Sequence, residues 1–211
     1  MSAQEIFFEA LSSAIDATIE KPDTRLVCAD SVLNGYLDMR VPELLNEICK
    51  SLCTTNDFSC RYAPMDGLIR NHKILGTRAV EFDEFQHFTQ QRKIALTISA
   101  SHCVLPFHAR YLSYCEDTDV LAEAYRTTRR VGFRRAVAGF RYDGGRMSQR
   151  AYFDTMKDYC HFSSKGQGFS TTLRFAIPDF DVLRESDFLR LDSTFIKNRI
   201  TDMLTVMPDF S

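Results

Sequence analysis

The segment GFSTTLRFAI at residues 168–177 is the clearest β-strand in the sequence, and Pro178 ends it. It stands late in the chain, between stretches whose apolar residues recur with the period of a helix. Strands and helices that do not alternate regularly favour an α+β fold over a parallel sheet wound by βαβ units. The segments on either side of this strand therefore decide how the sheet is built.

Helices are predicted at both ends of the chain. Residues 4–19 place apolar side chains on one face of a helix, at Ile6, Phe7, Ala10, Leu11, Ala14 and Ile15. Ser2 and Glu5 have the spacing of a capping box at the start of this helix. The last helix is expected at 193–207. Further helices are expected near residues 30–37, 42–52, 118–130 and 148–159, the last of them capped by Ser148.

The middle of the chain is expected to supply the rest of the sheet. Residues 93–114, KIALTISASHCVLPFHARYLSY, alternate in polarity and favour a strand. Residues 133–142 are expected to form another strand, which ends in a hairpin turn at residues 143–145. Residues 54–80 look irregular, because a proline and two glycines interrupt them.

Length and composition describe an ordinary folded protein. The chain has 211 residues, of which 45% are hydrophobic and 17 are phenylalanine, so it can bury a substantial core. We expect an α+β fold in which helices at both ends flank a mostly antiparallel central sheet. We expect a single domain of residues 1–211, with a helical N-terminal subregion at 1–60 and an α+β body at 61–211.

Cysteine usage and hydropathy indicate a cytoplasmic protein. The seven cysteines are irregularly spaced and do not resemble a disulfide framework. The N-terminus lacks the basic segment of a secretory signal, and no window reaches the roughly 18 apolar residues that a membrane helix needs. We therefore expect reduced thiols, no membrane partner, and a cytoplasmic location or, for a viral protein, a virion.

Charge is unevenly distributed along the chain. Residues 1–60 hold ten acids and four bases, whereas residues 61–150 hold nine acids and fifteen bases. Eight arginines lie close together in the basic part: Arg126, Arg129, Arg130, Arg134, Arg135, Arg141, Arg146 and Arg150. We predict that this arginine tract is a contact surface, for phosphate or for an acidic protein. The alternative is a solvated face whose arginines pair with nearby carboxylates.

Two short motifs, His87-Phe88-Thr89 and His161-Phe162-Ser163, repeat a histidine followed two residues later by a hydroxyl. This pair resembles the signature of the two-histidine phosphoesterase superfamily. The resemblance implies that His87 and His161 act as general base and general acid, and that Thr89 and Ser163 hold the phosphate. The alternative is a pair of partly exposed histidines near the ends of strands or helices.

Common enzyme and metal signatures are missing from the sequence. It has no Walker loop, no GxGxxG after a strand, no GxSxG elbow, no HExxH and no paired cysteine knuckles. We therefore expect no cofactor and no metal site, and the missing signatures favour a non-catalytic protein without deciding the point.

The leading hypothesis is a structural or assembly subunit of a larger complex, such as a component of a virus or phage particle. Its expected partners are other protein subunits, in a homo-oligomer or a multi-protein assembly. Two alternatives stay open: a phosphoesterase that uses the two histidine motifs, and a nucleic-acid-binding protein that uses the arginine tract.

Overall fold

The computed structural model describes residues 1–21, 36, 38, 40–52, 65–129, 135–137, 139–163 and 166–206. The helices are α1 (Ala3–Ile15), α2 (Arg40–Leu52), α3 (Gln90–His102), α4 (His108–Tyr114), α5 (Thr118–Thr128), α6 (Gly145–Asp158), α7 (Glu185–Phe188) and α8 (Ser193–Thr205). The strands are β1 (Gly67–His72), β2 (Gly76–Asp83) and β3 (Leu173–Ala176). Short 3₁₀ turns lie at η2 (Phe85–His87), η3 (Cys160–Phe162) and η5 (Ile177–Phe180).

The sheet has its strands in the order β1-β2-β3. β1 and β2 form an antiparallel hairpin, and Gly76 takes the left-handed backbone conformation (φ 66°) at its turn. β3 joins β2 in parallel, with Arg174 opposite Glu81 and Phe175 opposite Phe82. The helices α3 to α6 lie between these two strands in the chain. The sheet is therefore mixed, with one antiparallel and one parallel pair of strands.

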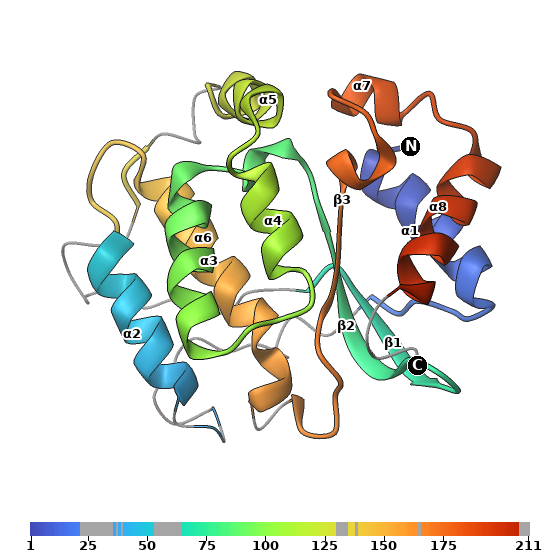
Figure 1. The fold of residues 1–211 in the computed structure, drawn as a ribbon, viewed down its shortest axis with the longest axis horizontal. Coiled ribbons are helices and arrows are strands. Elements are labelled where there is room, and N and C mark those ends of the chain that lie inside the picture. The colour runs from blue at the N-terminus through green and yellow to red at the C-terminus, as the bar shows by residue number, and fades with distance from the viewer. Residues whose placement is uncertain are drawn as a thin grey trace.

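Helices cover the sheet on both sides (Figure 1). One layer contains α3, α4 and α6, with α2 outside them, and the other contains α1 and α8. Within each layer the helices pack on one another, α3 against α6 and α1 against α8. The first and last helices of the described residues thus meet in the same layer.

The two faces of the sheet differ in chemistry. On one face, Phe7 of α1 stacks on Phe82 with ring centroids 4.4 Å apart, and it packs 5.1 Å from the ring of Phe175. Because successive side chains of a strand point to opposite faces, the neighbouring Asp83 and Arg174 turn towards α4 and α6. Both of these charged residues are buried. The sheet therefore has an aromatic face and an ionic face.

The α+β class and the helices at both ends are confirmed. Ser2 and Glu5 form the predicted capping box at the start of α1, with Ser2 N donating to Glu5 Oε2 and Glu5 N donating to Ser2 Oγ. The helices α2, α5 and α8 lie within two residues of their predicted bounds. The late strand is also present, as the shorter β3.

The strand predicted at residues 93–114 is wrong, because these residues form α3 and α4. The buried residues of α3 are Arg92, Ala95, Leu96 and Ser99. The last three follow Arg92 by three, four and seven positions, which places all four on one face of a helix. Two of these four core positions are polar. The apolar pattern alone therefore conceals the helical period.

Residues 54–80 are not irregular throughout, because the β1-β2 hairpin occupies much of their second half. The predicted hairpin turn at residues 143–145 instead begins α6, with Gly144 as N-cap at φ 87°. Ser148 lies inside that helix and does not cap it. The helix predicted at residues 30–37 falls outside the described residues except for Tyr36. The strand predicted at 133–142 is wrong where it is described, because residues 135–137 and 139–142 form no strand and Val137 and Phe140 pair only in an isolated bridge.

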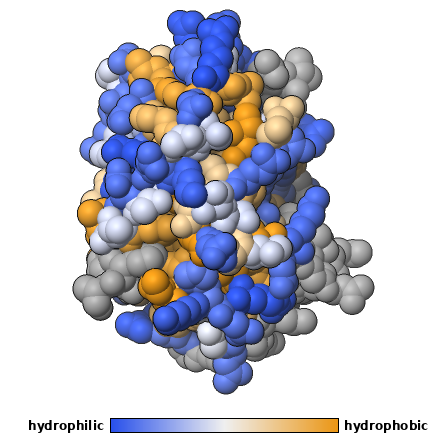
Figure 2. Space-filling model, turned by 90° about the vertical axis from the view of Figure 1, so that its right-hand side faces the viewer, coloured by the Kyte–Doolittle hydropathy of each residue, from blue (hydrophilic) through white to orange (hydrophobic). Residues whose placement is uncertain are grey.

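The outer face formed by α1 and α8 is mixed, with apolar patches between hydrophilic side chains (Figure 2). Large apolar side chains are exposed near the last two helices, at Leu183, Leu189 and Phe195. Within the described residues, no helix combines the length and the apolar character needed to cross a membrane.

The aromatic face predicts a large difference between two phenylalanines. Replacing the fully buried Phe7 with alanine should lower the free energy of unfolding by about 3–5 kcal/mol, because it leaves a cavity against β2 and β3. Phe195→Ala is the control, since Phe195 is 44% exposed and its loss should change stability by less than about 0.5 kcal/mol. Urea denaturation followed by circular dichroism measures both. Equal effects would contradict the assigned packing.

Candidate functional site

The candidate site begins where β2 ends. The 3₁₀ turn η2 follows Asp83 and brings His87 back towards it, four residues later. His87 Nδ1 lies 3.0 Å from Asp83 Oδ1 and 2.9 Å from Asp154 Oδ2 on α6. One imidazole nitrogen is therefore held between two carboxylates that come from different elements.

Arg174 of β3 joins this cluster from the sheet. Its Nη1 pairs with Asp83 Oδ2 and its Nε with Asp158 Oδ1, while Nη2 donates to the backbone oxygen of Asp154 at 3.1 Å. The side chains of Arg174, Asp83 and Asp158 are almost fully buried. Tyr111 of α4 adds its hydroxyl, 2.8 Å from Asp83 Oδ2.

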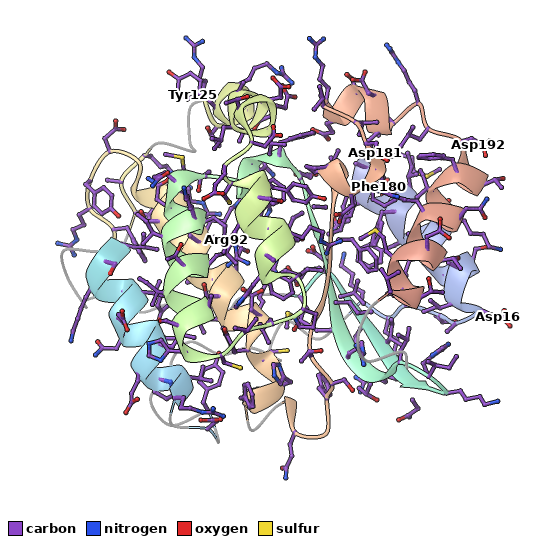
Figure 3. All side chains as sticks on the ribbon, in the orientation of Figure 1. Asp16, Arg92, Tyr125, Phe180, Asp181 and Asp192 are labelled. Atoms are coloured by element: carbon purple, nitrogen blue, oxygen red, sulfur yellow. The ribbon has the colours of Figure 1, made fainter. Side chains whose placement is uncertain are left out.

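Arg92 of α3 completes the buried charges on the same side. Its Nη2 lies 2.9 Å from Asp158 Oδ2 and its Nη1 is 3.3 Å from Thr155 Oγ1. Figure 3 shows Arg92 among the helices on this side of the sheet. Asp158 therefore serves two buried guanidinium groups, one from α3 and one from β3.

A second buried pair lies beside the cluster. Lys157 Nζ is 2.6 Å from Glu81 Oε2, and the two side chains are 12% and 1% exposed. Burial raises the pKa of Glu81 to about 7, although Lys157 opposes the shift. The ionic layer, defined as Glu81, Asp83, Asp154, Asp158, His87, Arg92, Lys157 and Arg174, thus matches four carboxylates with four basic side chains.

The cluster shifts the protonation of its members. Burial disfavours the charged form of His87, but the carboxylates of Asp154 and Asp83 outweigh it and raise the pKa of His87 to about 9. Burial also opposes ionisation of Asp83, yet Arg174 and His87 hold its pKa well below the usual value. His87 and Asp83 are therefore both charged at neutral pH.

A pocket of about 320 Å³ opens beside His87 and Asp154. Its charged lining comes from several elements: Asp66, Glu84, His87, Arg146, Arg150, Asp154 and Lys157. The side chain of His87 is 15% exposed, and its Nε2 makes no hydrogen bond with the described residues. A group that enters the pocket can therefore meet this nitrogen.

The three residues at the head of the cluster are also potential metal ligands. Among the described residues, Asp83, His87 and Asp154 form a group whose ligand atoms all lie within 4.8 Å of one another. Nitrogen and carboxylate oxygen are ligands that divalent transition metals accept.

Another cavity, of about 410 Å³, is lined by residues of α4, β3 and α8. Its walls are largely apolar. Arg110 Nη1 lies 2.9 Å from Asp179 Oδ1, and Arg199 Nε donates to the backbone oxygen of Asp179 at 2.8 Å. The pocket at His87 is the stronger candidate for polar chemistry, because it contains a histidine nitrogen that protein groups leave available.

The arginine tract is divided by the fold. Arg126 pairs with Glu123 at 2.6 Å, and the guanidinium of Arg129 lies 5.5 Å from the ring centroid of Tyr125. These contacts on α5 match the alternative in which the arginines form a surface with nearby partners.

The later part of the tract lies around the start of α6. Arg135 and Arg141 are exposed, whereas Arg146 and Arg150 are half-buried and line the pocket at His87. Arg130 and Arg134 fall outside the described residues.

The two histidine motifs do not lie on strands. His87 is in η2 and His161 is in η3, where its ring packs on Phe162 with centroids 4.1 Å apart. Thr89 Oγ1 accepts from Arg92 N as the N-cap of α3, and Ser163 Oγ donates to the backbone oxygen of Cys160. Of the four residues in these motifs, the structure brings only His87 to the pocket.

Sequence reasoning missed the two aspartates that hold His87 and the arginine behind them. Asp83 lies four residues before His87, and Asp154 lies four residues before Asp158 on α6. A pair of acids on the buried side of an amphipathic helix breaks the expected pattern. Two aspartates at buried positions of α6 were therefore the sequence signal that could have indicated a buried charge cluster.

Comparisons with protein-family models, curated proteins and solved structures give no match for this chain.

The ionic layer predicts a strong effect at Asp158. Asp158→Asn should lower the free energy of unfolding by about 3–5 kcal/mol, because two buried guanidinium groups lose their shared carboxylate. The exposed Asp202 of α8 is the control, and Asp202→Asn should change stability by less than about 0.5 kcal/mol. Thermal and urea denaturation measure both variants. Similar stability for the two would contradict the buried pairing.

Proposed function

We propose that the protein binds a small phosphorylated ligand in the pocket beside His87. The observation that carries this proposal is the convergence of Arg146, Arg150 and Lys157 on a pocket that also exposes an edge of the His87 ring. Arginine binds phosphate through paired N–H donors, and a lysine adds a point charge.

The lining also indicates the rest of the ligand. Asp66 and Glu84 stand in the same pocket as the basic residues, and carboxylates accept hydrogen bonds from hydroxyl groups. A volume of about 320 Å³ is at the small end of ligand pockets. The ligand that best fits these features is a phosphomonoester of a hydroxylated compound, such as a sugar phosphate.

Isothermal titration calorimetry with glucose 6-phosphate tests this proposal, with glucose and inorganic phosphate as comparison probes. Arg146→Gln should weaken binding of the sugar phosphate by about tenfold or more, because a hydrogen bond to a charged group contributes roughly 1.5–3 kcal/mol. Arg126→Gln, on α5 and outside the pocket, is the matched control and should bind as the wild type does.

Two results would contradict the proposal. One is the absence of binding by the wild-type protein at millimolar sugar phosphate. The other is tight binding of a single-stranded oligonucleotide that Arg141→Gln abolishes and sugar phosphate does not displace. That second result would assign the exposed arginines to nucleic acid instead.

A second proposal concerns assembly, and a specific surface feature favours it. Tyr125 is 53% exposed on the outer side of α5 (Figure 3), and Arg129 lies over its ring. Tyrosine and arginine are enriched at the centres of protein interfaces. We propose that this face contacts another copy of the chain. A role in a larger particle, such as a virion, would build on this contact.

Sedimentation velocity over a range of protein concentrations tests the assembly proposal. The wild type should form dimers or larger species, and Tyr125→Ser should shift the equilibrium towards the monomer by about tenfold, as loss of a modest interface anchor would do. Tyr114→Phe, a tyrosine of α4 that bonds to Asp179, is the control and should leave self-association unchanged. A wild type that stays monomeric at all concentrations would contradict this proposal.

A further inference from the structure

The head of the cluster has more acceptor atoms than hydrogens to share among them. His87 Nδ1 carries one hydrogen, and it donates to Asp154 Oδ2 at 2.9 Å. Asp83 Oδ1 lies 3.0 Å from the same nitrogen, yet it is buried and accepts no hydrogen bond from the described residues. A buried carboxylate oxygen without a donor is costly. A metal cation that displaces the Nδ1 hydrogen, which is released to solvent, would bind all three atoms at once.

The three atoms are close enough to share one ion, because all of them lie within 4.8 Å of one another. Two ligands bound at 2.0–2.1 Å are about 2.9 Å apart at the right angle of an octahedral site and about 3.3–3.4 Å apart in a tetrahedral site. The two separations measured from His87 Nδ1 are 2.9 Å and 3.0 Å.

Surrounding residues fix the orientation of these ligand atoms. Tyr111 and Arg174 bind Asp83 Oδ2, so that Oδ1 is the oxygen left facing His87. The backbone oxygen of Asp154 accepts from Arg174 as well. Outer partners of this kind orient metal ligands and increase affinity. They come from β3 and α4, which are ordered parts of the fold.

We propose that Asp83, His87 and Asp154 bind a divalent transition-metal ion of the zinc, cobalt or manganese kind. An imidazole with two carboxylates suits these ions better than Ca²⁺ or Mg²⁺, which prefer ligands that are all oxygen. His87 and Asp154 both line the pocket, so the ion lies at the pocket wall. The inference stands on the cluster itself and does not require that the pocket bind a phosphorylated ligand.

The first test uses the wild-type protein with the metal alone. Titration with Zn²⁺ should raise the melting temperature, and Co²⁺ should give the visible absorption of a nitrogen- and oxygen-ligated ion, while Ca²⁺ should do neither. Long-range ¹H–¹⁵N spectra of the histidine rings should show Zn²⁺ bound to Nδ1 of one histidine whose Nε2 keeps its hydrogen. No response to Zn²⁺ and Co²⁺ at millimolar concentration, or an equal response to Ca²⁺, would overturn the proposal.

Variants assign the site. His87→Gln and, independently, Asp154→Asn should weaken Zn²⁺ binding by more than about 100-fold, because even an outer partner of a ligand contributes roughly 10–100-fold. His102→Gln is the matched control: His102 contacts Glu47 at 2.8 Å on the surface, and its loss should leave the affinity unchanged. Binding that is lost in His102→Gln and kept in the other two variants would overturn the proposal. The wild-type spectra decide the matter if the cluster variants fail to fold.

Discussion

A guanidinium group cannot be buried without a partner except at a cost of several kcal/mol, and that of Arg174 is fully buried. Two carboxylates compensate it, Asp83 at the end of β2 and Asp158 at the end of α6, so one side chain joins β2, β3 and α6. Asp158 in turn neutralises Arg92 of α3. Charge thus holds α3 and α6 to one face of the sheet, and aromatic packing holds α1 to the other face.

The same pairing shapes the candidate site. Arg174 and Tyr111 engage Oδ2 of Asp83, which leaves Oδ1 directed at His87. Asp154, one helical turn before Asp158, lies on the other side of the imidazole. The histidine is therefore fixed at the pocket wall as a consequence of how β3 is bound to α6. The proposed phosphorylated ligand and the proposed metal ion would both bind at this histidine, and separate titrations test them.

Local signals in the sequence were sufficient for much of the fold. The capping box at Ser2 and Glu5 and the apolar stripe of α1 depend on neighbouring residues alone, and both were predicted. Helix α3 was missed because Arg92 and Ser99 occupy its core positions, where only the distant Asp158 makes an arginine tolerable. His87 was singled out for its spacing to Thr89. Its actual partners were not foreseeable, because the contact with Asp154 joins residues that are 67 positions apart.

Arg174 and Asp83 form a buried pair on which both the fold and the site depend. A double-mutant cycle measures this coupling directly, from the unfolding free energies of the wild type, Arg174→Met, Asp83→Asn and the double variant. We predict a coupling free energy of roughly 2–3 kcal/mol, the upper part of the range for contacting residues. A coupling close to zero, with the two single effects simply adding, would contradict the account.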